Sequence, residues 1–133
     1  MSEFVDSNVV VYAFSADRRA AAAQAILERQ CVTSVQALNE FANVAQRKLG
    51  KTWREIRDAL AAIRALCPTI LAIDVATHED ALRIAERYRL ALFDALMIAA
   101  ALQAKCDTLW SEDMQDGMVI DRRLRIADPF RAR

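Results

Sequence analysis

The sequence has few of the residues that interrupt regular structure or build metal centres. It contains two glycines and two prolines in 133 residues, which argues against long loops and disordered segments. It contains one histidine, His78, and three widely spaced cysteines, Cys31, Cys67 and Cys106, with no CxxC pair. We therefore expect neither a zinc site nor a disulfide framework, and predict buried free thiols in a reducing compartment.

Long hydrophobic runs are also missing, although 55% of the residues are hydrophobic. The longest uncharged apolar stretch, at residues 95–102, falls far short of the roughly 18 residues that a membrane-spanning helix needs. Glu3 and Asp6 interrupt the N-terminal residues, which is unlike a signal peptide. We expect a cytoplasmic protein without a membrane partner, whose residues 1–133 form a single domain.

Several catalytic schemes lack their residues. There is no GxSxG motif and no Gly-rich phosphate loop, since the only glycines are Gly50 and Gly117. A single histidine excludes a ribonuclease that works with two imidazoles. The charge balances at 18 basic and 18 acidic residues, whereas non-specific nucleic-acid binders are usually strongly basic. Either the chain binds no nucleic acid, or its acids gather at one site with bases around the rim.

Periodicity and capping signals predict strands that alternate with helices. The expected strands are residues 3–5, 31–33, 70–73, 107–110, 119–120 and 124–126. The expected helices are residues 17–28, 35–49, 53–67, 77–88 and 95–104, after a helical turn at 9–14. Candidate N-caps are Asp17, Ser34, Thr52 and Thr77, the last two with capping-box partners Glu55 and Asp80. Alternation implies parallel strands and right-handed crossovers, so we expect an α/β fold: a three-layer α/β/α sandwich with a central, mainly parallel sheet.

Four acids occupy places where such a fold builds sites. Asp6 ends the first strand, and Asp113 follows the strand that ends near Trp110. Ligands of open α/β sheets bind outside the carboxyl ends of the strands. Asp94 opens the apolar helix, and Glu40 lies on the helix after the second strand. Taken singly, each has an ordinary alternative as a loop acid, N-cap, solvated helix residue or turn residue.

Taken together, the acids point to a cation. Carboxylates about 5 Å apart repel by roughly 3 kcal/mol per pair at an effective dielectric constant near 20, and a divalent ion removes that cost. Because only oxygen ligands are available, Mg²⁺ is the expected ion, with Mn²⁺ as the alternative. The chemistry that suits such a site is phosphodiester hydrolysis by activated water.

The segments around these acids resemble the PIN-domain family, and in particular the VapC-type toxin ribonucleases of toxin–antitoxin pairs. The segments are FVDSNV at 4–9, SVQALNEF at 34–41, FDALMIAAA at 93–101, LWSEDMQDG at 109–117 and LRIADPF at 124–130. They cover nearly the whole chain, in order. The resemblance implies a PIN fold, Mg²⁺-dependent endoribonuclease activity that leaves a 3′-hydroxyl and a 5′-phosphate, homodimers, and inhibition by a cognate antitoxin.

The resemblance also implies roles for individual residues. Asp6 and Asp94 would be metal ligands, Asp113 would complete the shell directly or through water, and Glu40 would orient water or assist as a ligand. Behind them, the two donors that would hold the carboxylates are Asn8 and Ser111. Asp116 either reaches a second metal or is a turn acid before Gly117.

Two surfaces are predicted around this site. A basic rim for RNA would come from Arg18, Arg19, Arg47, Lys48 and Lys51, which are otherwise solvated helix residues. An apolar stripe that would hold the antitoxin consists of Trp53, Ile56, Leu60 and Ile63, which is otherwise ordinary core. If the groove exists, Trp53 or Ile56 is partly exposed in the isolated chain.

Two other functions compete with the ribonuclease. The first is an inert acidic pocket that binds a partner protein without turnover. The second is a metal-dependent phosphohydrolase of small molecules, which calls for an enclosed pocket instead of an open groove.

Overall fold

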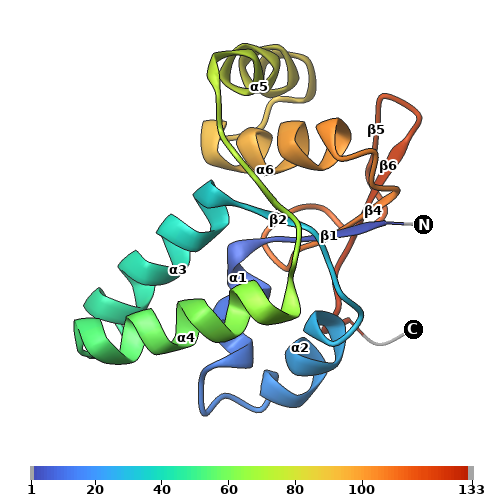
Figure 1. Ribbon diagram of the computed structural model, residues 1–133. Coiled ribbons are helices and arrows are strands. Elements are labelled where there is room, and N and C mark those ends of the chain that lie inside the picture. Colours follow the sequence, from blue (N-terminus) through green and yellow to red (C-terminus); the bar gives the residue numbers. More distant parts are fainter. Residues whose placement is uncertain (1, 132–133) are drawn as a thin grey trace.

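The computed structural model describes residues 2–131, which form six strands and six helices (Figure 1). All the predicted elements are present, with their ends shifted by a few residues. In chain order they are β1 (Glu3–Val5), α1 (Ser7–Ala13), α2 (Ala20–Leu27), β2 (Thr33–Ser34), α3 (Val35–Arg47), α4 (Trp53–Leu66), β3 (Ile70–Leu71), α5 (Val75–Tyr88), α6 (Leu92–Gln103), β4 (Thr108–Trp110), β5 (Val119–Ile120) and β6 (Leu124–Ala127).

The central sheet has the strand order β1-β4-β6-β5. β1, β4 and β6 run parallel, and β5 pairs antiparallel with β6. The parallel pair β2–β3 lies beside β1, because Val5 N–H donates to the Val32 oxygen and Val32 N–H donates to the Glu3 oxygen, at 2.9 and 2.7 Å. The carboxyl ends of the parallel strands therefore meet at one edge, where such folds bind ligands.

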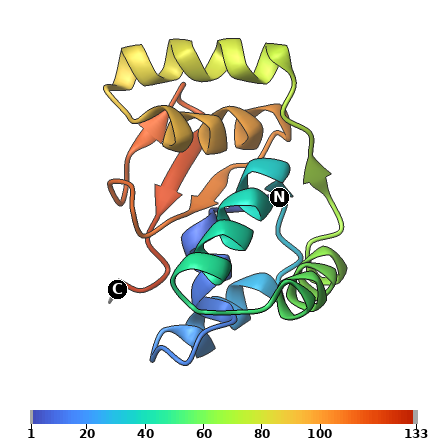
Figure 2. The same cartoon turned by 90° about the vertical axis from the view of Figure 1, so that its left-hand side faces the viewer.

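Successive residues of β1 point to opposite faces of the sheet, as strand geometry requires. Phe4 aligns with Leu109 of β4, which aligns with Ile126 of β6, and these three lie in one core together with α5 and α6. Val5 lies in a second core with side chains of α1, α2, α3 and α4. Figures 1 and 2 show α5 and α6 on one side of the sheet and the other helices on the opposite side. The predicted three-layer sandwich is confirmed.

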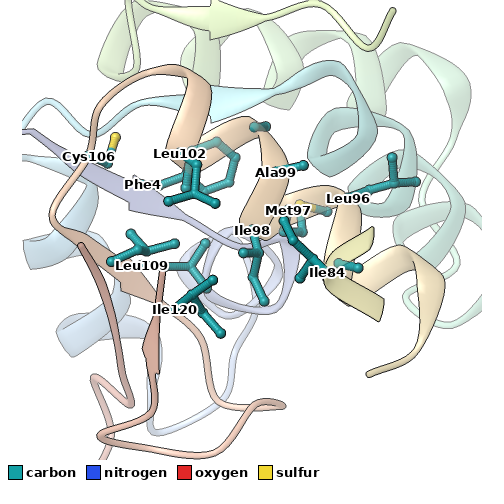
Figure 3. Packing of buried hydrophobic residues seen from close by; sticks show 14 of the residues in the cluster. Phe4, Ile84, Leu96, Met97, Ile98, Ala99, Leu102, Cys106, Leu109 and Ile120 are labelled. Carbon is teal, nitrogen blue, oxygen red and sulfur yellow. The ribbon is translucent and has the colours of Figure 1, made fainter. Parts of the chain in front are cut away.

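Helix α6 is the most deeply buried helix of the structure's described part. All eight residues from Ala95 to Leu102 are buried, which is why this stretch has no polar face. Figure 3 shows Ile98 packed with Leu109 and Ile120 of the sheet and with Ile84 of α5. Burying each such aliphatic side chain contributes roughly 1.5–3 kcal/mol. This packing fixes the position of the helix whose first turn carries Asp94.

The capping signals were correct for two helices and wrong for two others, the first of which is α2. Ser34 caps α3, and Thr52 with Glu55 forms the predicted capping box of α4. Asp17 does not cap α2, which begins at Ala20. Its carboxylate accepts the backbone N–H two residues later, within the turn that precedes the helix.

Two further helix starts differ from the prediction. Helix α5 begins earlier than expected, because Asp74 is its N-cap and accepts the N–H of Thr77 at 2.8 Å; the predicted capping box of Thr77 with Asp80 is therefore wrong. Helix α6 begins at Leu92, so Asp94 lies in its first turn and is not its N-cap.

The three cysteines are buried and unpaired, as predicted. Burial raises the pKa of the Cys31 thiol to about 12 and the pKa values of Cys67 and Cys106 to about 11, which leaves all three protonated at neutral pH. Within residues 2–131, no helix is both long and apolar enough to cross a membrane.

Candidate functional site

The candidate site lies at the carboxyl edge of β1 and β4. These neighbouring strands are parallel, so the residues that follow them, Asp6 and Ser111, lie side by side. Asp6 N–H donates to the Trp110 oxygen at 3.0 Å, which continues the strand pairing up to the site. Parallel pairing thus brings together two segments that are about a hundred residues apart in sequence.

The carboxylate of Asp6 is buried and bonded to three donors. Its Oδ1 accepts the backbone N–H of Ser7 at 2.6 Å. Its Oδ2 accepts the Ser111 hydroxyl at 2.7 Å and the Asn8 amide at 3.1 Å. Asp6 is also the N-cap of α1, which explains why the chain turns into a helix directly after the strand. The side chain therefore has one fixed orientation.

Asn8 connects Asp6 to Asp113. Its Nδ2 lies within hydrogen-bonding distance of both carboxylates, at 3.1 Å from Asp6 and 3.2 Å from Asp113. Its Oδ1 accepts the backbone N–H of Glu112, and Ser111 Oγ accepts the N–H of Asp113. The structure thus places both predicted supporting donors, Asn8 and Ser111, between the acids.

Glu40 reaches the same site from α3. Its Oε1 accepts the Ser7 hydroxyl at 2.8 Å, and that hydroxyl also lies 3.4 Å from Asp6 Oδ1. Its Oε2 accepts the amide of Gln36, one turn earlier on the same helix, at 2.9 Å. Ser7 therefore bridges the first and second acids, a role that the sequence analysis did not assign.

Asp94 contributes from the first turn of α6 and is half-buried. No hydrogen-bond donor contacts its side chain within residues 2–131. Burial raises its pKa, and the negative charges of Asp113 and Glu40 raise it further. The pKa of Asp94 therefore depends on the charges of Asp113 and Glu40, although no hydrogen bond joins them.

Burial is also the main cause of the shift at Asp6. It raises the pKa of Asp6 to about 6, against the opposing hydrogen bonds from Ser111 and Ser7. The charges of Glu40 and Asp94 raise this pKa by less. Desolvation is therefore the main cause of the raised pKa of Asp6, and repulsion from the other acids makes a smaller contribution.

Among residues 2–131, no basic side chain forms an ion pair with the cluster. Within the described part of the chain, the ion pairs involve other acids, and none includes Asp6, Glu40, Asp94 or Asp113. The acids are also spaced loosely: among residues 2–131, no three His, Cys, Asp or Glu side chains are close enough to hold a metal ion as they stand. To share one ion, the acids would therefore have to move from the positions that they occupy here.

Two of the acids, Glu40 and Asp113, line a groove of about 490 Å³ between α1, α3, the start of α6 and the loop after β4, and Asp6 and Asp94 lie outside this lining. Its lining includes Tyr12, Asn43, Lys48, Phe93 and Glu112, besides Asn8, Glu40 and Asp113. Tyr12 donates its hydroxyl to Glu112 at 2.8 Å, which braces the loop that carries Asp113. The spacing of Glu40, Val44 and Lys48 along α3 could have indicated a shared face, but nothing local marks Tyr12 or Phe93.

Of the five predicted rim bases, only Lys48 lines this groove. Arg19 pairs with Asp17 and Glu112, so its charge is already compensated. Lys51 lines a different, apolar pocket between α3 and α4. Arg18 and Arg47 are exposed and contribute to neither pocket.

Asp116 is bonded away from the four acids. One of its oxygens accepts the N–H of Asp128 at 2.8 Å, and the other pairs with Arg131 at 3.4 Å. These contacts hold the segment after β6 and favour the alternative in which Asp116 is a turn acid.

The apolar stripe of α4 is divided between core and surface. Ile56 and Ile63 are buried in the core, and Leu60 is partly buried against the same core. The prediction that all four residues form one continuous open groove is therefore wrong. Trp53 is 59% exposed, whereas Ile56 is 2% exposed. The expectation that one of these two is exposed is confirmed for Trp53 alone.

Comparison with known proteins gives a family and a fold. A model of the PIN domain family matches residues 4–115. No curated protein matches the chain. Among solved structures, a toxin–antitoxin complex from Klebsiella pneumoniae is similar with a TM-score of 0.75 at 21% identity, covering 98% of this chain and 100% of that one.

Two other structures have the same fold. VapC20 of Mycobacterium tuberculosis, a toxin that cleaves the sarcin–ricin loop, has a TM-score of 0.69 at 21% identity, covering 84% of this chain and 92% of its own. VapBC2 of Rickettsia felis, bound to a DNA fragment from its promoter, has a TM-score of 0.69 at 15% identity, with 96% and 98% covered.

Proposed function

Because this chain belongs to the PIN domain family, we propose that it is a metal-dependent endoribonuclease and the toxin of a toxin–antitoxin pair. Asp6, Glu40, Asp94 and Asp113 are its proposed catalytic residues. The family relationship supports a nuclease, and the similar folds include a toxin that cleaves RNA. The proposal treats residues 1–133 as one cytoplasmic domain.

The observation that carries this proposal is a carboxylate cluster without a protein cation. The four acids come from four separate regions of the chain, share donors or electrostatic coupling, and have no Lys or Arg partner within residues 2–131. An anionic cluster that is partly buried is costly unless something positive joins it. Its position at the carboxyl edge of the sheet supports a ligand site.

The donor set fits a hard divalent cation, with Mg²⁺ first and Mn²⁺ as the alternative, because it consists of carboxylate oxygens alone. Asp6, Asp94 and Asp113 would hold the ion. When bound, such an ion activates water and neutralises charge on a phosphodiester. Asn8 and Ser111 hold the carboxylates by hydrogen bonds, and Glu40, which Ser7 and Gln36 hold, would accept a proton from the attacking water.

The groove favours a polymer over a small substrate. It is open to solvent along α3 and the start of α6, so it does not enclose a molecule as a small-molecule phosphohydrolase would. An inert binding module remains the competing explanation, and activity measurements separate the two.

The test is cleavage of single-stranded RNA in Mg²⁺ by the wild type and Asp94→Asn. We expect EDTA to abolish cleavage and the substitution to reduce kcat by at least 100-fold, because it removes a metal ligand while leaving the side-chain volume unchanged. Asp58→Asn, an exposed acid on α4, is the matched control and should cleave like the wild type. Metal-independent cleavage, or full activity of Asp94→Asn, would contradict the proposal.

The proposed partners are an RNA substrate, a cognate antitoxin and a second copy of the chain in a homodimer. The antitoxin is supported by the similar fold of a chain from a toxin–antitoxin complex. Trp53 is the side chain of the predicted stripe that is available to bind it. The other residues of the stripe are buried or partly buried in the core, so the surface of α4 that could contact an antitoxin is smaller than predicted.

A further inference from the structure

Phe93 is an exposed aromatic side chain in the groove that Glu40 and Asp113 line. It lies in the first turn of α6, directly before Asp94, and its side chain is 60% exposed. Phenylalanine side chains are usually buried, and an exposed one leaves apolar surface in contact with water, which is unfavourable. Its position beside a proposed metal ligand suggests a contact with substrate.

The other aromatic residue of the groove is not available in the same way. Tyr12 is packed edge-on against Phe130, with ring centroids 5.1 Å apart, and Arg19 lies over its ring at 4.9 Å. Within residues 2–131, no aromatic or cationic group contacts the ring of Phe93 in this manner. Phe93 thus offers the groove's free ring face.

Lys48 supplies positive charge to the same groove. It is exposed, and no acid lies within ion-pair distance of it among the described residues. It follows Glu40 by about two helical turns, so its backbone lies about 12 Å along the helix axis from that of Glu40. A cation at that distance can bind a phosphate farther along the strand than the one that the acids contact.

Resting on the proposed function, we propose that Phe93 stacks on an unpaired base of the RNA while Lys48 binds another phosphate of the same strand. An aromatic face and a cation along one groove are the two features that single-stranded nucleic-acid sites combine. Stacking requires an unpaired base, so this groove selects single-stranded over duplex RNA. Every base has a π-face, so Phe93 contributes affinity with little sequence preference.

The experiment measures binding separately from cleavage. Fluorescence anisotropy with a labelled single-stranded RNA is recorded in Ca²⁺ in place of Mg²⁺, and a gel verifies that the RNA stays intact. We expect Phe93→Ala and Phe93→Leu to weaken binding about tenfold, since leucine keeps apolar bulk but loses the ring face. Phe93→Trp should bind within about threefold of the wild type.

Matched controls exist for both residues. Trp53→Ala removes an aromatic of the same exposure outside the groove and should leave RNA affinity unchanged. Lys48→Ala should reduce the slope of log affinity against log salt by about 0.7, as expected for one single-strand phosphate, while Arg47→Ala should not. Thermal melts should be unchanged for Phe93→Ala because the side chain is exposed.

The outcomes separate this inference from the proposed function. If Phe93→Ala binds RNA like the wild type, the stacking role is wrong even if Asp94→Asn abolishes cleavage. If it instead shifts the oligomeric state and spares RNA affinity, a second copy covers Phe93 and the inference is overturned. If the wild type binds RNA through Phe93 but never cleaves it, the inference stands and the proposed enzyme fails. If the wild type binds no RNA, both fail.

Discussion

Burial of Asp6 predicts that the metal-free protein becomes less stable as the pH rises from 4 to 7. The pKa of Asp6 is about 6 in the folded chain and 3.8 in the reference state. Between these values the folded state binds more protons than the unfolded state, so stability falls as the pH rises and levels off above pH 6. A difference of about two pKa units corresponds to about 3 kcal/mol. Asp6 is only 3% exposed, so solvent screening removes little of this.

The assay is urea unfolding in EDTA at several pH values, for the wild type and Asp6→Asn. Acids with lowered pKa values, such as Glu3, Asp74 and Asp121, act with the opposite sign: their stabilisation is present above the unfolded pKa and is lost as the pH falls. They are common to both proteins and cancel in the comparison. An asparagine at position 6 cannot accept the hydrogen bonds of Asn8 and Ser111 as well as the carboxylate does. The resulting loss of stability does not depend on pH.

We therefore expect the free energy of unfolding of the wild type to fall relative to Asp6→Asn by about 2.4 kcal/mol between pH 4 and pH 7, because part of the full effect lies below pH 4. Mg²⁺ binds the ionised form and should stabilise the wild type at pH 7 by about 2.7 kcal/mol at a hundred times its Kd. The variant should gain much less. Parallel profiles for the two proteins between pH 4 and 7 would refute the reasoning, as would an Asp6 carboxyl that titrates near 4 by NMR.

Three other perturbations test separate parts of the molecule. Asn8→Ala should reduce Mg²⁺-dependent cleavage about 10- to 100-fold, because Asp6 and Asp113 lose their common donor, and an unchanged kcat would contradict this role. Trp53→Ala should weaken binding of the protein encoded by the adjacent reading frame by about 2 kcal/mol or more in calorimetry while sparing RNA cleavage; equal affinity would place the antitoxin elsewhere. Ile98→Ala should lower the free energy of unfolding by about 2–5 kcal/mol in urea, and a loss under about 1 kcal/mol would mean that the core around α6 collapses around the cavity.

The sequence by itself determined the order of the elements and the edge of the sheet at which the acids lie. Asp6 and Asp113 follow strands, and parallel strands separated by helices place their carboxyl ends together. The apolar run at residues 95–102 required a helix between two layers. The capping box at Thr52 and Glu55 is a local interaction that any sequence reading can find.

Starts of helices were less predictable where local signals compete. Asp94 has the residue type of an N-cap, yet α6 begins at Leu92 without a side-chain cap. Packing of the following eight residues against the sheet determines where that helix lies, and such packing outweighs the roughly 1 kcal/mol that a cap contributes. Freed from capping, the Asp94 carboxylate is available to the site.

Only the tertiary structure decided which predicted side chains are accessible. Periodicity shows that Trp53 and Ile56 belong to one helix stripe, but Ile56 packs into the core that includes Phe41 and Ala45 of α3, whereas Trp53 stays exposed. The sequence predicts Arg19 as an RNA-binding residue, but in the folded chain its guanidinium pairs with Glu112. Asn8 bridges to Asp113 across 105 positions of sequence. Periodicity indicates which residues share a face of a helix. Whether those residues are exposed or paired depends on segments distant in sequence that pack against that face, and the local sequence pattern does not contain this information.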